Sequence, residues 1–404
     1  MDVTDEPTWL RVFSTVLLRA HLWQADQIAE TIDASMTELG ITPTVYLVDH
    51  EQRALHALTP AGRPRPAPVP VDGSVAGRAF AQIRSLAAAG DDDRRRWWVP
   101  MIDGTTRIGV IDFLLPAGPD PGSPVLQQRC ELFAGLIGHL IITTVPRGDH
   151  LSLARRTRSM SVASELLLQP LTIACDRAAV SAMLQPCYDV GGDGYDYAVD
   201  ADLARLSILD GVGRGLRAGL ATAVALAALR AARRDGRDLV GQARTADAAL
   251  GEQFTDARFV TAVLAELDLD TGVLRLLSAG HPAPLLLRAG RVVGELEGGR
   301  RTPLGVADPH GRPAEHRLEP GDQVLLFTDG ITEARDATGE QFGVHRLAEL
   351  AGQHAAAGLP APETVRRLSH AVIEHQHGPP ADDATLLLAE WSPAAARRMI
   401  PLNP

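Results

Sequence analysis

Four acidic positions in the sequence share one local setting, the point where an apolar strand meets a turn. They are Asp193 in "DVGGDGYD", Asp210 after "RLSIL", Asp329 after "VLLFT", and the pair Asp382 and Asp383 before "ATLLLAEW". Carboxylates that meet at one edge of a folded sheet repel one another and raise one another's pKa. Hard divalent cations remove that cost, and Mg²⁺ and Mn²⁺ prefer oxygen ligands. Together these positions suit a site for two metal ions and a water made nucleophilic.

A single aspartate of this kind carries little information, because an Asp-Gly pair usually forms only a turn. The segments "DLDTG" and "MIDGTT" of the same chain are expected to be ordinary hairpin turns. The argument for a metal site therefore rests on the joint occurrence of the four positions with suitable neighbours.

The segment "ILDGVGRGLRAGL", residues 208–220, allows two interpretations. Gly213, Gly215 and Ala218 fit the G-x-G-x-x-A pattern of a dinucleotide-binding loop. Alternatively, Asp210 is a metal ligand and the glycines only let the chain turn. The dinucleotide interpretation needs an acidic residue at the end of a second strand about 20 residues on. The segment found there, "LRAARRDGRD", reads as the tail of a helix, which favours the metal loop.

Composition indicates an ordinary globular protein with two or three domains. The chain has 404 residues, of which 45% are apolar and 22% charged, and its net charge is -11. That charge argues against nonspecific nucleic-acid binding. The three cysteines form no CxxC motif, so we expect no zinc or redox motif and a cytoplasmic location. The acidic N-terminus is not a signal peptide, and no apolar stretch reaches the roughly 18 residues of a membrane span.

Residues 1–148 read as helix, strands, short helix, hairpin and helix. This order and size resemble a GAF-type sensor domain, which implies an unidentified small-molecule or protein effector. The expected elements are helical spacing from about 8 to 40, two strands in 44–58, a strand, turn and short helix in 69–88, a hairpin in 97–116 and an amphipathic helix in 123–145.

Residues 149–174 are predicted to be a helical linker whose helix ends at Pro170. Two readings of that helix stay open, a dimer-forming helix or an unpaired surface helix, so a homodimer is possible. From residue 175 to 392 short strands alternate with turns, and two helices are clear, at 215–234 and 362–375. This pattern predicts an α+β sandwich and not a doubly wound sheet. Residues 393–404 form a tail.

The stretch from Pro186 to Trp391 resembles the SpoIIE-like (RsbU-type) branch of metal-dependent serine/threonine protein phosphatases. The resemblance is carried, in the order of the family, by "DVGGDGYD", "LDGVGRGLRAGL", "SAGHP", "TPLGV", "LEPGDQVLLFTDGITEARDATGEQFGVHRL" and "DDATLLL". It implies an αββα sandwich that holds two Mn²⁺ or Mg²⁺ ions. The implied ligands are Asp193, Asp210, Asp329 and Asp382, together with the backbone carbonyl of Gly211. Asp383 can exchange roles with Asp382, because spacing alone does not separate them.

The resemblance also implies a reaction and a substrate class. Water activated by the metal ions attacks phosphorus in line, without a covalent intermediate. The family's typical substrates are phosphoserine or phosphothreonine forms of small anti-sigma-factor antagonists. Two other functions stay open: a catalytically silent phosphatase fold kept as a scaffold, and a ligand-sensing binding module whose output is dimerisation.

Several residues near these motifs are expected to be structural. Arg214 stands where the family often has histidine, and it either contacts phosphate or faces solvent. We expect His281 of "SAGHP" to be structural, Tyr195 and Asp196 to serve packing and support of the site, and Cys187 to be a small buried residue.

Overall fold

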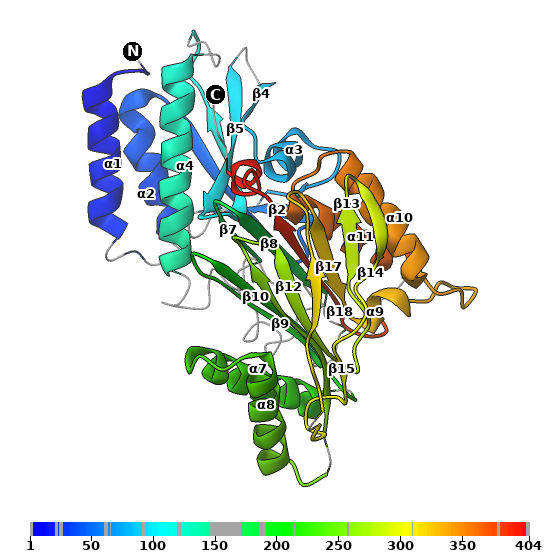
Figure 1. The fold of residues 1–404 in the computed structure, drawn as a ribbon. Coiled ribbons are helices and arrows are strands. Elements are labelled where there is room, and N and C mark those ends of the chain that lie inside the picture. The colour runs from blue at the N-terminus through cyan, green and yellow to red at the C-terminus, as the bar shows by residue number, and fades with distance from the viewer. Residues whose placement is uncertain are drawn as a thin grey trace. The chain divides into compact units, whose positions relative to one another are not determined.

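A computed structural model shows the fold as two compact units (Figure 1). The units are Met1–Thr157 with Met399–Pro404, and Arg158–Arg398. The predicted linker helix up to residue 170 and the side chain of Arg214 lie outside the residues that the structure describes. The described residues are 3–20, 23, 27–59, 64, 66–90, 94–118, 123–144, 171–185, 187, 191–213, 215–256, 258–308, 310–377 and 380–400.

The first unit is an antiparallel six-stranded sheet in the order β3-β2-β1-β6-β5-β4. Its strands are β1 Thr42–Val48, β2 Ala54–Ala57, β3 Val69–Pro70, β4 Leu86–Ala89, β5 Arg95–Asp103 and β6 Thr106–Leu114. Its helices are α1 Glu6–Ala20, α2 Ile28–Met36, the short 3-10 helix η1 Thr37–Leu39, α3 Val75–Gln82 and α4 Pro124–Thr144. One core joins the sheet to α1, α2 and α4, and a second core joins it to α3.

Local sequence explains the main elements of this unit. The Ser74 hydroxyl accepts a hydrogen bond from the Gly77 backbone N–H at 2.8 Å, which caps the start of α3. The turn between β5 and β6 contains Gly104 at a φ of 57°, a conformation that glycine adopts without strain. The predicted order of helix, strands, short helix, hairpin and helix is confirmed, and β4 is an additional strand.

The second unit contains two six-stranded sheets. The first has the order β15-β12-β11-β10-β9, with β16 also paired to β12, and the second has the order β14-β13-β17-β18-β8-β7. The strands of the first sheet are β9 Asp193–Val199, β10 Leu203–Gly211, β11 Val260–Asp268, β12 Val273–Ala279, β15 Arg300–Arg301 and β16 Ala314–Arg317. Those of the second are β7 Thr172–Cys175, β8 Ala178–Gln185, β13 Leu285–Arg288, β14 Arg291–Glu295, β17 Gln323–Phe327 and β18 Ala384–Trp391.

Helices cover the outer face of each sheet, so the layers run α, β, β, α (Figure 1). The alternate residues of each strand divide between two cores. Ile208 and Leu206 of β10 belong to the core between the sheets, whereas Leu209 packs under α7 and α8. The helices are α7 Leu216–Arg234, α8 Leu239–Gln253, α9 Asp329–Thr332, α10 Gly343–Ala356 and α11 Ala361–Gln376. The predicted α+β sandwich is therefore confirmed for this unit.

Two details differ from the sequence-based expectation. Thr172, Ile173 and Ala174, which we placed in the helical linker, belong to β7, where Thr172 pairs with Ser181 of β8. The helices α8 and α10 were also not predicted. The buried face of α8, "LVGQARTADAALGEQ", has only two large apolar residues, Leu239 and Leu250, to mark it. In the described part of the chain, no helix has both the length and the apolar character needed to cross a membrane.

Candidate functional site

The predicted acidic residues gather at one end of the space between the two sheets of the second unit. Asp193 begins β9 and Asp210 lies near the end of β10, directly opposite it in the antiparallel register. The second sheet contributes Asp329, just after β17, and Asp382 and Asp383, just before β18. Residues that are far apart along the chain therefore meet at one edge.

The Asp193 carboxylate is buried and is held by hydroxyl groups from the opposite sheet. Its Oδ2 accepts hydrogen bonds from Thr328 Oγ1 at 2.8 Å and from Thr385 Oγ1 at 2.7 Å. The Thr385 backbone N–H in turn donates to Thr328 Oγ1 at 3.0 Å. These bonds fix the distance between the two sheets at the site. Neither threonine was singled out from the sequence, although Thr385 is the threonine of the "DDATLLL" motif.

Asp382 and Asp383, which spacing did not separate, have different surroundings. Asp383 is buried, and its Oδ1 and Oδ2 accept hydrogen bonds from the backbone N–H groups of Cys187 at 2.8 Å and Asp193 at 3.2 Å. Asp382 is exposed, and its Oδ1 accepts from the Asp383 backbone N–H at 2.9 Å. Asp383 thus anchors the chain before β9, whereas the Asp382 carboxylate stays accessible.

Two glycines of the motifs are required by close approach to Asp383. A Cβ atom at Gly330 would lie 1.8 Å from the Asp383 carbonyl oxygen, and one at Gly191 would lie 1.5 Å from Asp383 Oδ2. Real Cβ atoms never come so near to such atoms, so a larger residue at either position would displace β18 or its aspartate. The glycines of "VGGD" and "FTDG" therefore serve the packing of the site.

Mutual repulsion raises the pKa values of the carboxylates. The pKa of Asp193 is raised well above its usual value by burial and by the charges of Asp210 and Asp383. Burial, followed by the charges of Asp329, Asp382 and Asp383, raises the pKa of Asp210 to about 7. A group of carboxylates that disfavours its own ionised form is the arrangement that a bound cation relieves.

The outer part of the acidic cluster is open to solvent. Asp329 is exposed, and its pKa is raised by burial of part of the group and by the charges of Glu333 and Asp382. Glu333 was not predicted from the sequence, because it follows the strand end by one helical turn and belongs to no strand-end pattern. The cluster thus runs from the buried Asp193 to the exposed Asp329 and Glu333.

The loop after Asp210 does not belong to a dinucleotide-binding unit. Gly213 and Gly215 have φ values of 107° and 76°, and Gly215 precedes the first residue of α7. However, β10 pairs antiparallel with both β9 and β11, whereas the dinucleotide motif requires a parallel βαβ unit. The glycines therefore turn the chain from the acidic cluster into α7, as the metal-loop interpretation expects.

His281 connects the two sheets beside the cluster. Its Nε2 donates to the Phe327 carbonyl at 3.1 Å, because a carbonyl only accepts, and its Nδ1 accepts from Thr261 Oγ1 at 2.8 Å. Thr261 lies opposite Asp210 in the β10–β11 pair. Burial lowers the pKa of His281 to about 4, so the imidazole is neutral near pH 7. These contacts support the structural role expected for this residue.

The other residues expected to support the site also have clear partners. Tyr195 is buried in the core between the sheets. Asp196 faces α7, where it accepts hydrogen bonds from Arg230 at 3.0 Å and Arg233 at 2.5 Å, so it fastens the helix to β9. Cys187 is only partly buried, and its backbone N–H holds Asp383.

The donor set fits a divalent cation in its chemistry. Its members offer carboxylate oxygens, the ligands that Mg²⁺ and Mn²⁺ prefer, and their raised pKa values report uncompensated negative charge. Among the described residues, no group of three or more His, Cys, Asp or Glu side chains has the arrangement of a formed metal site. The acidic residues are therefore brought together, and their role as ligands stays a prediction.

Comparison with known proteins identifies the domain that carries this cluster. Residues 200–392 match the family model described as Stage II sporulation protein E (SpoIIE). These residues resemble that family in sequence. The matched segment includes Asp210, Asp329, Asp382 and Asp383, and Asp193 lies just before its first residue. The resemblance inferred from the motifs is confirmed, and the GAF-like interpretation of residues 1–148 stays a prediction.

One curated relative of this chain is named as a phosphatase. The curated protein "Phosphoserine phosphatase RsbU" of Bacillus subtilis (strain 168) is 25% identical over 223 residues, which cover 54% of this chain and 64% of that protein. The chain thus spans less than two thirds of the length of this curated relative.

Comparison with solved structures also finds partial matches. The RsbU and RsbW domains of a Mycobacterium tuberculosis protein are 24% identical with a TM-score of 0.48, covering 56% of this chain and 63% of that one. The SiaA-PP2C domain of Pseudomonas aeruginosa is 28% identical with a TM-score of 0.48, covering 53% and 86%.

Proposed function

We propose that this protein is a metal-dependent phosphatase that hydrolyses phosphoserine or phosphothreonine on a regulatory protein. The observation that carries this proposal is the carboxylate cluster at the edge of the two sheets. Its residues lie in, or shortly before, residues 200–392, which match the SpoIIE family model. A protein that had no use for a cation would gain stability by losing such a concentration of like charges.

The residues that would hold two Mn²⁺ or Mg²⁺ ions extend from the buried to the exposed end of the cluster. They are Asp193, Asp210, Asp329 and Asp382, with the Gly211 carbonyl. When bound, such ions neutralise phosphoryl charge and activate a water for attack on phosphorus. Asp383 has both oxygens engaged by backbone N–H groups, so we assign it the positioning of the chain before β9.

The side chains of this protein prepare the site in two further ways. Thr328 and Thr385 orient the Asp193 carboxylate, so that one of its oxygens is committed to the opposite sheet. The exposed Asp329 and Asp382 mark the side from which a phosphoester enters. Because the entrance is open, a phosphoserine on a protein surface can reach it without prior unfolding.

The proposed substrate is a phosphorylated anti-sigma-factor antagonist or a similar small regulatory protein. Support comes from the curated relative named RsbU and from the similar structure that contains RsbU and RsbW domains. We further propose that residues 1–148 form a GAF-like sensor whose effector controls residues 175–392 through the linker at 149–174, in a monomer or a homodimer, in the cytoplasm.

Phosphate release from p-nitrophenyl phosphate tests the proposal, measured with Mn²⁺, with Mg²⁺ and with EDTA. Asp210→Asn and Asp329→Asn should abolish metal-dependent turnover. Asp268→Asn is the matched control, because Asp268 is an acidic residue of the same unit whose carboxylate holds an exposed turn at the opposite end of β11 from Thr261.

Three outcomes separate the candidate functions. Metal-dependent turnover lost in both variants establishes the phosphatase. Metal binding detected by calorimetry, without turnover, indicates an autoinhibited enzyme that needs its effector. Absence of both metal binding and turnover overturns the proposal and favours the catalytically silent scaffold.

A further inference from the structure

Large apolar side chains are exposed together beside the acidic cluster. Among the described residues of the second unit, the exposed ones include Val212, Leu216, Leu220 and Val306, with exposed fractions of 38%, 69%, 46% and 43%. We call these four residues the α7 apolar surface. Solvent exposure of apolar area is costly, and a group of such side chains marks a surface that another molecule covers.

Two of the four residues share one face of α7. Leu216 and Leu220 are one helical turn apart, so their side chains lie on the same side of the helix, and Val212 lies in the loop before it. The opposite side of α7 is fully used, because Ala218, Ala221 and Ala225 are buried against the sheet and α8. The packing of the domain therefore leaves this outer face without a partner among the described residues.

Val306 joins the same surface through Arg258. A Cβ atom at Gly213 would lie 3.4 Å from Arg258 Nη1, and a Cβ at Gly305 would lie 2.5 Å from the Arg258 carbonyl oxygen. The neighbours of these glycines, Val212 and Val306, therefore flank one arginine. The surface combines apolar side chains with a cationic group at its middle.

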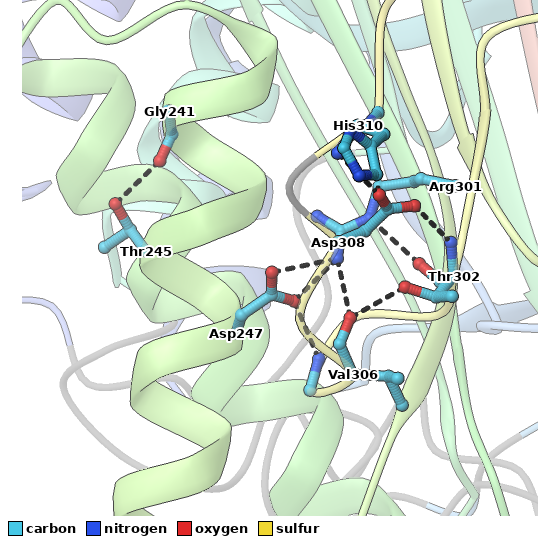
Figure 2. A network of polar contacts seen from close by, with 10 residues as sticks. Gly241, Thr245, Asp247, Arg301, Thr302, Val306, Asp308 and His310 are labelled. Carbon is cyan, nitrogen blue, oxygen red and sulfur yellow. Dashed lines mark hydrogen bonds and ion pairs between the residues drawn. The ribbon is translucent and has the colours of Figure 1, made fainter.

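The loop that carries Val306 is held in place. Figure 2 shows how Arg301 reaches from this loop to Asp247 of α8. The buried Arg301 donates to both carboxylate oxygens of Asp247, at 2.9 and 2.8 Å, and to the Val306 carbonyl at 3.0 Å. The Gly305 backbone N–H also donates to Asp247 Oδ1 at 2.9 Å. A surface with so little freedom loses little entropy when a partner binds.

The α7 apolar surface adjoins the acidic cluster through the backbone around Gly211. Gly211 pairs with Val260, which pairs in turn with Leu304, two residues before Val306. The Val212 backbone N–H donates to the Phe259 carbonyl at 3.3 Å. A protein that presents a phosphate to the cluster would therefore lie near α7.

Arg217, whose side chain has an exposed fraction of 74%, and the partly buried Arg258 share Asp256 as a partner, at 3.4 and 3.1 Å. Arg217 and Asp256 supply the polar rim that apolar contact surfaces usually have.

We propose that the α7 apolar surface is the docking site for the protein substrate, and that it selects phosphoproteins with apolar side chains near the phosphoserine or phosphothreonine. This inference rests on the proposed phosphatase function, for which the surface would determine which phosphoproteins bind. The acidic cluster would process the phosphate, and the surface would recognise the protein that carries it.

Matched synthetic phosphoserine peptides test this proposal. One set carries a single leucine at successive positions on either side of the phosphoserine, and its partner set carries serine there. For the wild-type protein we expect the best leucine peptide to have a kcat/KM about tenfold above its serine partner, the ratio that about 1.4 kcal/mol of apolar burial produces. Leu216→Ser and Leu220→Ser should remove that preference while p-nitrophenyl phosphate turnover stays unchanged.

Val293→Ser is the matched control, since Val293 of β14 has an exposed fraction of 55% but belongs to the other sheet. It should keep the leucine preference. Turnover of p-nitrophenyl phosphate without any leucine preference in the wild-type protein overturns the docking proposal alone. Faster p-nitrophenyl phosphate turnover, or a changed oligomeric state, in Leu216→Ser also overturns it, because the surface is then covered by this chain or by a second copy. Absence of both metal binding and turnover in the wild-type protein instead refutes the phosphatase function itself.

Discussion

Replacing Asp210 by asparagine is expected to stabilise the metal-free protein above neutral pH while removing its activity. Burial and the neighbouring carboxylates raise the pKa of Asp210 from 3.8 to about 7 in the folded protein. A carboxyl group with a raised folded pKa contributes stability that is fully present below pH 3.8 and is lost as pH rises through about 7. Ionised Asp210 therefore opposes folding at pH 8, and a neutral asparagine does not.

The size of the effect follows from the pKa difference. About three pKa units correspond to about 4 kcal/mol at 1.36 kcal/mol per unit. The asparagine amide needs hydrogen bonds of its own in a half-buried place, which offsets about 1–2 kcal/mol. We therefore expect a net gain of about 2–3 kcal/mol at pH 8. For a unit of this size, such a gain raises the midpoint of thermal unfolding by roughly 5–10 °C.

The assay is thermal unfolding in EDTA at pH 5, 6.5 and 8, followed by near-ultraviolet circular dichroism. At pH 5 Asp210 is protonated when folded, so the two proteins should unfold at nearly the same temperature. Adding Mn²⁺ should stabilise the wild-type protein and leave Asp210→Asn almost unchanged. Asp268→Asn, at an exposed turn, serves as the control and should gain nothing at pH 8. A variant no more stable than wild type at pH 8, or a gain independent of pH, refutes the reasoning.

Three further changes test the packing of the site. Gly330→Ala places a Cβ 1.8 Å from a backbone oxygen and should cost about 2 kcal/mol or more in urea unfolding, whereas Gly251→Ala meets nothing within 4 Å and should not destabilise. Thr385→Val removes one hydroxyl from Asp193 and should lower kcat for p-nitrophenyl phosphate about tenfold, with Thr385→Ser restoring it. The folded pKa of His281, about 4, lies below its usual 6.5, so wild-type stability should fall as pH drops through this range. In His281→Asn that part of the pH dependence should vanish, as urea midpoints at pH 7 and 4.5 will show.

Local signals explain why most of the fold could be predicted from the sequence. The hairpin turns at "DLDTG" and "RAGR" hold Gly272 and Gly290 at φ values of 70° and 75°, which glycine adopts readily, and strands of alternating burial flank both. The helix α8 gave a weaker signal, because only two of its five buried residues, Leu239 and Leu250, are large and apolar. Short strands such as β15, with two residues, are defined by their partner β12 and not by their own sequence.

The acidic residues of the site could be predicted from the sequence, but the hydrogen bonds that orient them could not. Strand-end position marked Asp193 and Asp210, and the register places them opposite each other. The distinction between Asp382 and Asp383 depends on backbone N–H groups near residue 190, far along the chain, so no local pattern contains it. The same holds for Thr328, whose hydroxyl acts only after the two sheets have come together.

The hydrogen bond from the Asp193 backbone N–H to Asp383 Oδ2 joins residues that are 190 positions apart. Contacts between residues so far apart in sequence form late and slowly, because the chain must first lose the conformational entropy of closing a long loop. During synthesis, a ribosome-bound chain that lacks β18 has Asp193 and Asp210 in place but has neither Asp383 nor Thr385. Such a nascent chain has no complete acidic cluster, so under the proposed function it would remove no phosphate from another protein before its own folding is finished.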